Sequence, residues 1–138
     1  MSTAGRCLEF VRSGEIQLFV SPSTLAEIRE VLSRPRILAL LPHASREAIE
    51  KFLEDIVTRA TLVRNVPEKF RFERDPKDAP YLNLAISVEL DYLVTRDKDL
   101  LDLMTSYGAE SKEFRQRFRR VKIIQPEELI LALDQRGP

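Results

Sequence analysis

The fold class of this 138-residue chain is decided by one stretch, DYLVTRDKDLL at residues 91–101. Its apolar run at 92–95 is typical of a buried strand, and an acid-rich segment and a short helix near 98–104 follow directly. A second apolar run, IQLFV at 16–20, is followed by Ser21-Pro22, a good N-cap and first helical residue. Each of these strands therefore leads directly into a helix.

Outward from this stretch, strands and helices alternate along the whole chain. The patterns predict helices over 3–12, from Pro22 to the stop at Pro35, over 45–60, 79–90 and 98–104, and from Pro126 to about Leu133. They predict strands at 16–20, 61–66 (an edge strand), 92–95 and 121–124, with a loop at 67–77 and irregular or weakly helical structure at 105–120. The strands are apolar without polar alternation, which favours an α/β fold with a parallel sheet covered on both faces.

Composition restricts the class of protein further. Lys plus Arg and Asp plus Glu both number 22, so the net charge is zero and does not favour nucleic-acid binding through bulk charge. Hydrophobic residues make up 43% and no linker divides the chain, so residues 1–138 are expected to form one domain. The single cysteine, Cys7, indicates a reducing compartment, and no apolar run approaches the ~20 residues of a membrane span. We therefore expect a cytoplasmic protein without membrane contact.

Acidic residues lie where the predicted strands end and the predicted helices begin. They are Glu27, in the second turn after the first strand, Asp78 at a helix start, and Asp97 and Asp99 directly after the 92–95 strand. The carboxyl ends of parallel strands share one edge of a sheet, and converging carboxylates repel one another unless a cation holds them. Mg²⁺ or Mn²⁺ suits such oxygen ligands and can activate water for phosphodiester hydrolysis.

Each acid also has a purely structural interpretation. Glu27 can complete a capping box with Thr24, although Ser21-Pro22 makes Ser21 the better cap. Asp78 is a good helix N-cap, and one of Asp97 and Asp99 can cap the helix that follows them. No one of these acids is specific for catalysis when it is taken alone.

The stretch ESKEFRQRFRRVK at 110–122 is basic, with six cations against two acids. Phe114 and Phe118 stand at helical spacing, so one side of this segment can dock while its arginines bind phosphates. The alternative is a solvated loop. The candidate RNA-binding residues are Arg115, Arg117, Arg119 and Arg120.

Several segments together resemble the PIN-domain family, and in particular the toxin components of prokaryotic toxin–antitoxin pairs. They are SP at 21–22 with AEI at 26–28, RDPKD at 74–78, LNLA at 82–85, DYLVTRDKDLL at 91–101 and IIQPEEL at 123–129. The resemblance extends from about residue 5 to residue 133, and DYLVTRDKDLL is its most specific part.

This resemblance implies a metal-dependent ribonuclease with a three-layer α/β/α fold. Its catalytic and metal-binding acids would be Glu27, Asp78 and Asp97, with Asp99 as a fourth metal ligand, and Mg²⁺ or Mn²⁺ would activate water for attack on RNA. Toxin members of the family are typically neutralised by an antitoxin protein and often form homodimers.

The chain departs from the family pattern at its start. PIN domains open with a central strand that ends in a metal-binding aspartate, whereas this chain begins with a predicted helix. The corresponding strand would lie between the strands at 16–20 and 92–95. Three explanations are open: the natural protein is longer, the domain has degenerated, or a partner or second copy supplies the strand. A non-catalytic binding module is therefore the alternative function.

Overall fold

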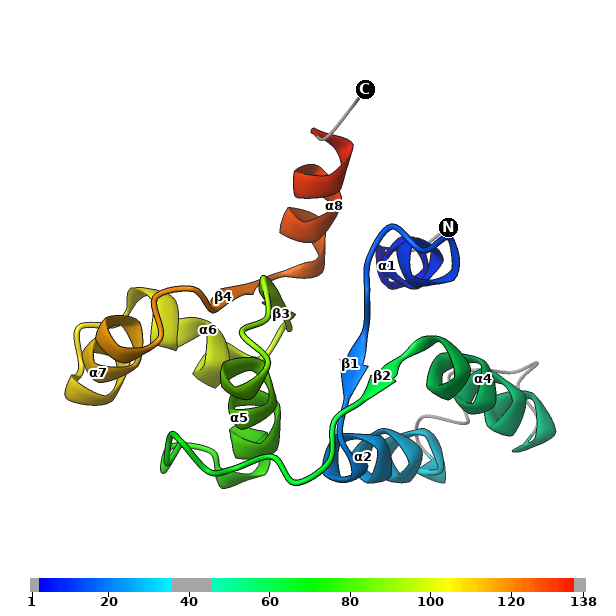
Figure 1. The fold of residues 1–138 in the computed structure, drawn as a ribbon, viewed down its shortest axis with the longest axis horizontal. Helices are drawn as coiled ribbons and strands as arrows, with labels where there is room; N and C mark the ends of the chain where they lie inside the picture. Colours follow the sequence, from blue (N-terminus) through cyan, green and yellow to red (C-terminus); the bar gives the residue numbers. More distant parts are fainter. Residues whose placement is uncertain (1–2, 36–45, 136–138) are drawn as a thin grey trace.

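The computed structural model describes residues 3–35 and 46–135, in which helices are linked by short strands (Figure 1). The elements of the first half are α1 (Thr3–Arg12), β1 (Phe19–Val20), α2 (Pro22–Leu32), α4 (Arg46–Arg59) and β2 (Thr61–Leu62). Those of the second half are the 3-10 turn η1 (Pro76–Asp78), α5 (Ala79–Ser87), β3 (Tyr92–Val94), α6 (Lys98–Thr105), α7 (Ala109–Arg117), β4 (Lys122–Ile124) and α8 (Pro126–Asp134). No helix among these residues is long and apolar enough to cross a membrane.

The strands pair in parallel, as the apolar runs predicted, and the fold is α/β. β1 pairs with β2 in the register Phe19 with Thr61, and β3 pairs with β4 in the register Leu93 with Ile123. Within the described residues, these pairs form two separate two-stranded sheets that are not hydrogen-bonded to each other. All four strands are shorter than the apolar runs that predicted them.

The predicted start of α2 is confirmed in detail. Ser21 is the N-cap, and its hydroxyl accepts a hydrogen bond from the Thr24 backbone N–H at 3.2 Å. The Thr24 hydroxyl in turn accepts from the Ser21 backbone N–H at 2.9 Å, and both residues are buried. The alternative capping box between Thr24 and Glu27 is therefore wrong, because the Thr24 hydroxyl completes the box with Ser21 instead.

The main hydrophobic core lies in the second half of the chain. Phe70, Leu103 and Phe114 are almost completely buried in it, and the Phe70 and Phe114 rings meet edge to face with centroids 5.3 Å apart. The remaining members come from α5, α6, β4 and the segment before η1: Phe72, Leu82, Ala85, Ile86, Leu100, Val121 and Ile123. In the first half, only Val20 and Leu53 are buried hydrophobic residues among those described.

Two predicted elements differ in part from the structure. The segment 105–120, expected to be irregular or weakly helical, contains a regular helix, because α7 occupies residues 109–117 and buries Phe114 completely. α5 ends at Ser87 rather than at residue 90, because the backbone reverses at Glu89, which has a positive φ of 49°.

The two halves meet along their terminal and central helices. α1 packs against α8, where Arg6 and Asp134 form an ion pair at 3.3 Å and the Cys7 thiol donates to the Pro126 carbonyl at 3.8 Å. α2 also contacts α5. Residues of β1 and β3 line one groove between the halves. Figure 1 shows β1 and β3 on the inner sides of the two halves, with β2 and β4 beyond them.

Asn83, buried in α5, fastens the segment before η1 to this helix. Its side-chain oxygen accepts from the backbone N–H groups of Lys69 and Phe70 at 2.7 and 2.9 Å. Its side-chain nitrogen donates to the carbonyls of Phe70 and Ala79, both at 3.0 Å. Three of these hydrogen bonds satisfy backbone groups of the irregular segment, and the fourth joins the amide to the carbonyl one turn earlier in α5.

We predict that Asn83→Ala lowers the free energy of unfolding by about 2–3 kcal/mol, since two backbone N–H groups lose their acceptor. Urea denaturation followed by circular dichroism measures the change. Gln116→Ala removes an exposed amide from α7 and is the matched control. Equal stabilities of the two variants would show that the Asn83 network contributes nothing.

Candidate metal centre

Asp97 is fixed where β3 ends and α6 begins. Its Oδ1 accepts hydrogen bonds from the backbone N–H groups of Asp99 at 2.8 Å and Leu100 at 3.4 Å. Its own N–H donates to the Thr95 hydroxyl at 3.0 Å. Asp97 is therefore the helix cap that the sequence assigned to one of two aspartates. The capping bonds occupy one carboxylate oxygen and hold the side chain rigidly at the strand end.

Three carboxylates lie close enough to share one cation. Single oxygens of Asp75, Asp97 and Asp99 all lie within 4.8 Å of one another. The sequence predicted Asp97 and Asp99 as site residues but missed Asp75. The segment around Asp75 lacks the hydrophobic periodicity of a strand or a helix, so its side-chain directions could not be predicted. The signal available was the RDPKD segment itself: Asp75 Oδ1 accepts from the Lys77 N–H at 3.2 Å and thereby caps η1.

Asp78 lies beside this cluster and is half-buried. Its pKa rises from 3.8 to about 7, chiefly because burial penalises the charged form and also because Asp97 and Asp75 are negative. Its Oδ2 is buried without a hydrogen-bond partner among the described residues. Asp78 stands at the N-cap position of α5 but makes no capping bond, because η1 gives its backbone helical angles. Its interpretation as a helix cap is therefore wrong.

Glu27 approaches the same edge from α2. The half-buried Tyr81 of α5 has a pKa raised to about 12, first by burial and then by the charge of Glu27, with a smaller effect from Asp78. The charges of Glu27 and Asp78 therefore both raise the pKa of Tyr81, although Glu27 is outside the set of three converging carboxylates. The structure brings the four predicted acids to one region and adds Asp75.

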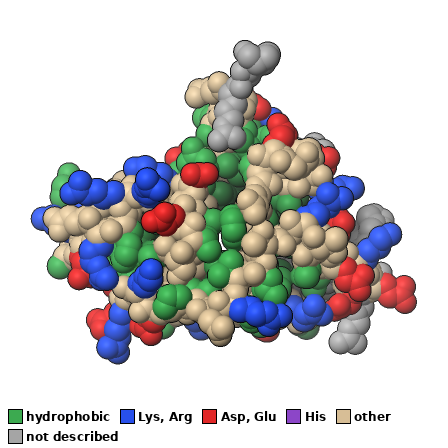
Figure 2. All heavy atoms as spheres, viewed as in Figure 1, with side chains coloured by type: hydrophobic (Ala, Val, Ile, Leu, Met, Phe, Trp, Pro, Cys, Tyr) green, Lys and Arg blue, Asp and Glu red, His purple; other side chains and the backbone are tan. Residues whose placement is uncertain are grey.

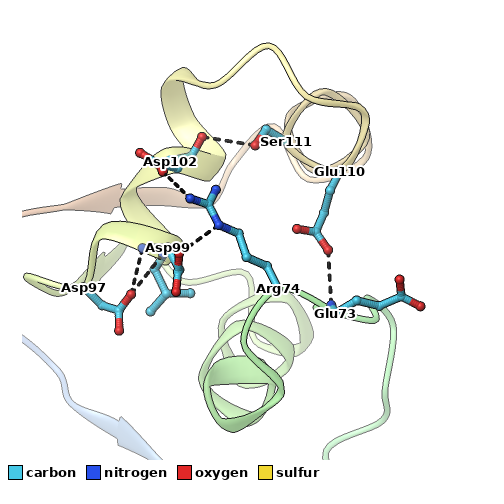
Figure 3. A network of polar contacts seen from close by, with 8 residues as sticks. Glu73, Arg74, Asp97, Asp99, Asp102, Glu110 and Ser111 are labelled. Atoms are coloured by element: carbon cyan, nitrogen blue, oxygen red, sulfur yellow. Dashed lines mark hydrogen bonds and ion pairs between the residues drawn. The ribbon is translucent and has the colours of Figure 1, made fainter.

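Arg74 occupies the outer side of the cluster (Figure 3). Its guanidinium contacts Asp99 at 2.8 Å and Asp102 at 2.6 Å, and both acids raise its pKa. The Ser111 hydroxyl donates to the Asp102 carbonyl at 3.1 Å, which joins α7 to this network. Arg74 thus supplies one positive charge to a site with several negative ones and partly relieves their repulsion.

This donor set fits a hard divalent cation. All candidate ligands are carboxylate oxygens. Mg²⁺ and Mn²⁺ prefer such oxygen ligands, whereas softer metals do not. The buried, unpartnered Oδ2 of Asp78 is the group that a bound cation would satisfy, since a cation favours the charged form. Asp75, Asp97 and Asp99 would hold the ion directly, and Asp78 lies beside them.

Comparison with family models supports this assignment. The family model described as PIN domain matches residues 1–99, which is more than two thirds of the chain. This chain belongs to the PIN-domain family. Comparisons with curated proteins and with solved structures found no match. The matched residues of the PIN domain contain all the candidate acids, from Glu27 to Asp99.

The basic segment 110–122, which includes most of α7 and the residues after it, lies outside the matched part of the PIN domain, and its four arginines differ in their surroundings. Arg115 donates to the carbonyls of Leu103 and Ser106, both at 2.8 Å, and so completes the C-terminal end of α6. The guanidinium of Arg117 lies 4.8 Å from the ring centroid of Phe118 and donates to the Lys69 carbonyl. Arg119 and Arg120 are exposed, as is Arg117, and Arg120 forms an ion pair with Glu89 at 3.6 Å.

We predict that Asp78→Asn stabilises the metal-free protein at pH 8. The raised pKa of Asp78 means that the folded state binds more protons than the unfolded state between about pH 4 and 7, so stability falls as pH rises through that window. The variant removes this penalty, so its advantage in Tm should be largest at pH 8 and vanish below pH 4. Thermal scans in EDTA measure it, with exposed Asp91→Asn as control.

Proposed function

We propose that this PIN domain is a Mg²⁺- or Mn²⁺-dependent ribonuclease. The observation that carries the proposal is the convergence of the Asp75, Asp97 and Asp99 carboxylates within 4.8 Å, with Asp78 buried beside them. Carboxylates assembled from separate segments at this proximity disfavour one another unless a cation is present. Their position at strand ends and helix starts is also where open α/β folds place chemistry.

Some residues of the site would hold the metal ion, and others would position the groups around it. Asp97 is locked by its capping bonds, so its second oxygen is presented in one direction. Tyr81, with its pKa of about 12, stays protonated at neutral pH and can donate its O–H to a phosphate oxygen. A divalent ion, when bound, supplies an activated water and stabilises the charge that develops on the phosphodiester. Glu27 and Asp78 position Tyr81 and complete the acidic edge.

RNA would be held by cations outside the acidic edge. Arg119 is exposed and makes no side-chain hydrogen bond or ion pair with the described residues, so its charge is available to a phosphate. Arg117 and Arg120 are exposed as well, whereas Arg115 acts mainly through the end of α6. Because the net charge of the chain is zero, we expect RNA to bind to this local basic segment rather than through the charge of the whole surface.

We further propose that this ribonuclease is the toxin of a toxin–antitoxin pair, acting on cellular RNA in the cytoplasm and able to form a homodimer. The support is the resemblance of DYLVTRDKDLL at 91–101 and IIQPEEL at 123–129 to that branch of the family. An antitoxin protein would then be its partner. A non-catalytic binding module is the second candidate, favoured by the two separate sheets, whose strands pair less extensively than in one continuous sheet.

We predict that Asp97→Asn lowers Mn²⁺ affinity at least roughly 10-fold and abolishes metal-dependent cleavage of single-stranded RNA. Asparagine keeps the helix cap, so stability should change little and the loss reports the charge alone. Calorimetry with Mn²⁺ and a fluorescent RNA substrate provide the two measurements, and Asp91→Asn is the control. Mn²⁺ binding without any cleavage would favour the binding module, and absence of both would refute the metal site.

We predict that Arg119→Glu weakens RNA binding and reduces its salt dependence, since each phosphate contact contributes about 0.7 to the slope of log K against log salt. Fluorescence anisotropy titrations at salt concentrations from about 50 to about 300 mM measure the slope. The variant's slope should correspond to about one phosphate contact fewer. Lys51→Glu makes the same charge change on the exposed face of α4. Equal effects of the two variants on RNA binding would argue against a specific role for the segment 110–122 in that binding.

A further inference from the structure

The segment that carries Asp75 has no helix or strand to hold it in place. Residues 63–75 form neither, and η1 begins only after them. The Asp75 carboxylate accepts from the Lys77 N–H, which fixes it within its own segment but not relative to α6. Asp97 and Asp99, in contrast, stand at the start of α6. The position of Asp75 relative to these two acids therefore depends on contacts that neighbouring residues make with α6 and α7.

Arg74 makes such a contact with two acids of α6 (Figure 3). Its Nε lies 2.8 Å from Asp99 Oδ1, and its Nη2 lies 2.6 Å from Asp102 Oδ2. The two acids stand three residues apart on the helix, so one edge of the guanidinium meets neighbouring carboxylates on the same helix face. Arg74 directly precedes Asp75 in the chain. Its side chain therefore ties the backbone beside one candidate metal ligand to the carboxylate of another.

A backbone contact supports the same position. The Glu73 N–H donates to Glu110 Oε2 of α7 at 3.2 Å. α7 is in turn joined to α6, because the Ser111 hydroxyl donates to the Asp102 carbonyl at 3.1 Å. Figure 3 shows both contacts on either side of the guanidinium. The segment before η1 is thus held by its backbone against α7 and by the next side chain against α6.

Arg74 also places a positive charge beside a site for a cation. A metal ion held by Asp97 and Asp99 would be repelled by this guanidinium. The chain has no net charge, and Figure 2 shows acidic and basic side chains interspersed over the displayed face, so local charges dominate the field there. The charge of Arg74 therefore weakens metal binding, whereas its bridge to α6 strengthens metal binding by fixing the ligands. The two effects have opposite signs and can be separated by experiment.

We propose that Arg74 is a positioning residue, which holds Asp75 and Asp99 in place for Mg²⁺ or Mn²⁺ and thereby favours these small ions over Ca²⁺. Mg²⁺ demands near-ideal octahedral geometry, whereas Ca²⁺ accepts more oxygen ligands in a flexible arrangement. Carboxylates that are held rigidly therefore discriminate between the ions, and loosened carboxylates discriminate less. This inference rests on the proposed metal-dependent function and names the residue that sets its metal preference.

Calorimetric titrations of the full chain with Mn²⁺ and with Ca²⁺ test the proposal without RNA. Arg74→Gln removes both the charge and the bridge. If only the charge mattered, this variant would bind Mn²⁺ more tightly than the wild-type chain does. Because the bridge positions two ligands, we expect Mn²⁺ binding that is weaker by about 10-fold or more. The affinity for Ca²⁺ should fall less, so the preference for Mn²⁺ over Ca²⁺ should narrow.

Two further variants separate charge from positioning. Arg74→Lys keeps the charge, but a single ammonium lacks the planar edge that meets both acids. Positioning by the guanidinium predicts weaker Mn²⁺ binding and a narrowed preference in this variant, whereas charge alone predicts wild-type behaviour. Arg71→Gln is the matched control, since Arg71 lies in the same segment, is exposed, and lies 3.6 Å from Glu73. It should leave both metal affinities unchanged. Circular dichroism reports whether each variant is folded.

The outcomes distinguish this inference from the proposed ribonuclease function. Unchanged or tighter Mn²⁺ binding by Arg74→Gln overturns the positioning role and leaves the metal site itself intact. So does a ratio of Mn²⁺ to Ca²⁺ affinity that stays at the wild-type value in both Arg74 variants. An equal loss of affinity in Arg71→Gln also overturns it, because the effect would then not depend on the bridge to α6. Absence of Mn²⁺ binding to the wild-type chain would overturn the metal-dependent function and this inference together.

Discussion

Burial of α5 on every side is the constraint on which the rest of this structure depends. Five consecutive residues, 82–86, are buried, so the helix cannot be displaced without exposing the main core. α5 contacts α2, β3 and η1, and it therefore connects the two halves of the chain. Its first turn places Asp78 beside Asp97, and its middle fastens the preceding segment through Asn83. The acidic site and the core are thus two consequences of one packing arrangement.

Charge is distributed locally although the chain is neutral overall. Several carboxylates gather around the starts of α5 and α6, and Arg74 forms ion pairs with Asp99 and Asp102 there. A group of basic residues lies instead in the segment 110–122, whose Arg119, just beyond the end of α7, is exposed. Such separation means that burial and mutual repulsion raise the pKa of Asp78, while the opposite charge stays available to a polyanion.

Local sequence chemistry predicted the elements that depend on neighbours in the chain. The Ser21 cap, the helix over 3–12 and a cap by one of Asp97 and Asp99 are all confirmed, because capping uses residues within three or four positions. The helical alternative for 105–120 could not be chosen from the sequence, because the order of α7 depends on burying Phe114 in a core formed by distant segments. Asp75 was not predicted as a site residue, because a loop has no hydrophobic periodicity that shows which side chain turns inward.

The sequence by itself determined the α/β class, the parallel pairing of its apolar strands and the presence of acids where strands end, since these follow from periodicity and short-range chemistry. Only the tertiary structure decided that Asp75 joins Asp97 and Asp99, that one carboxylate oxygen of the half-buried Asp78 is shielded from solvent, and that the described strands form two sheets. Each of these depends on distances between segments far apart in the chain, which are set by packing rather than by local propensity.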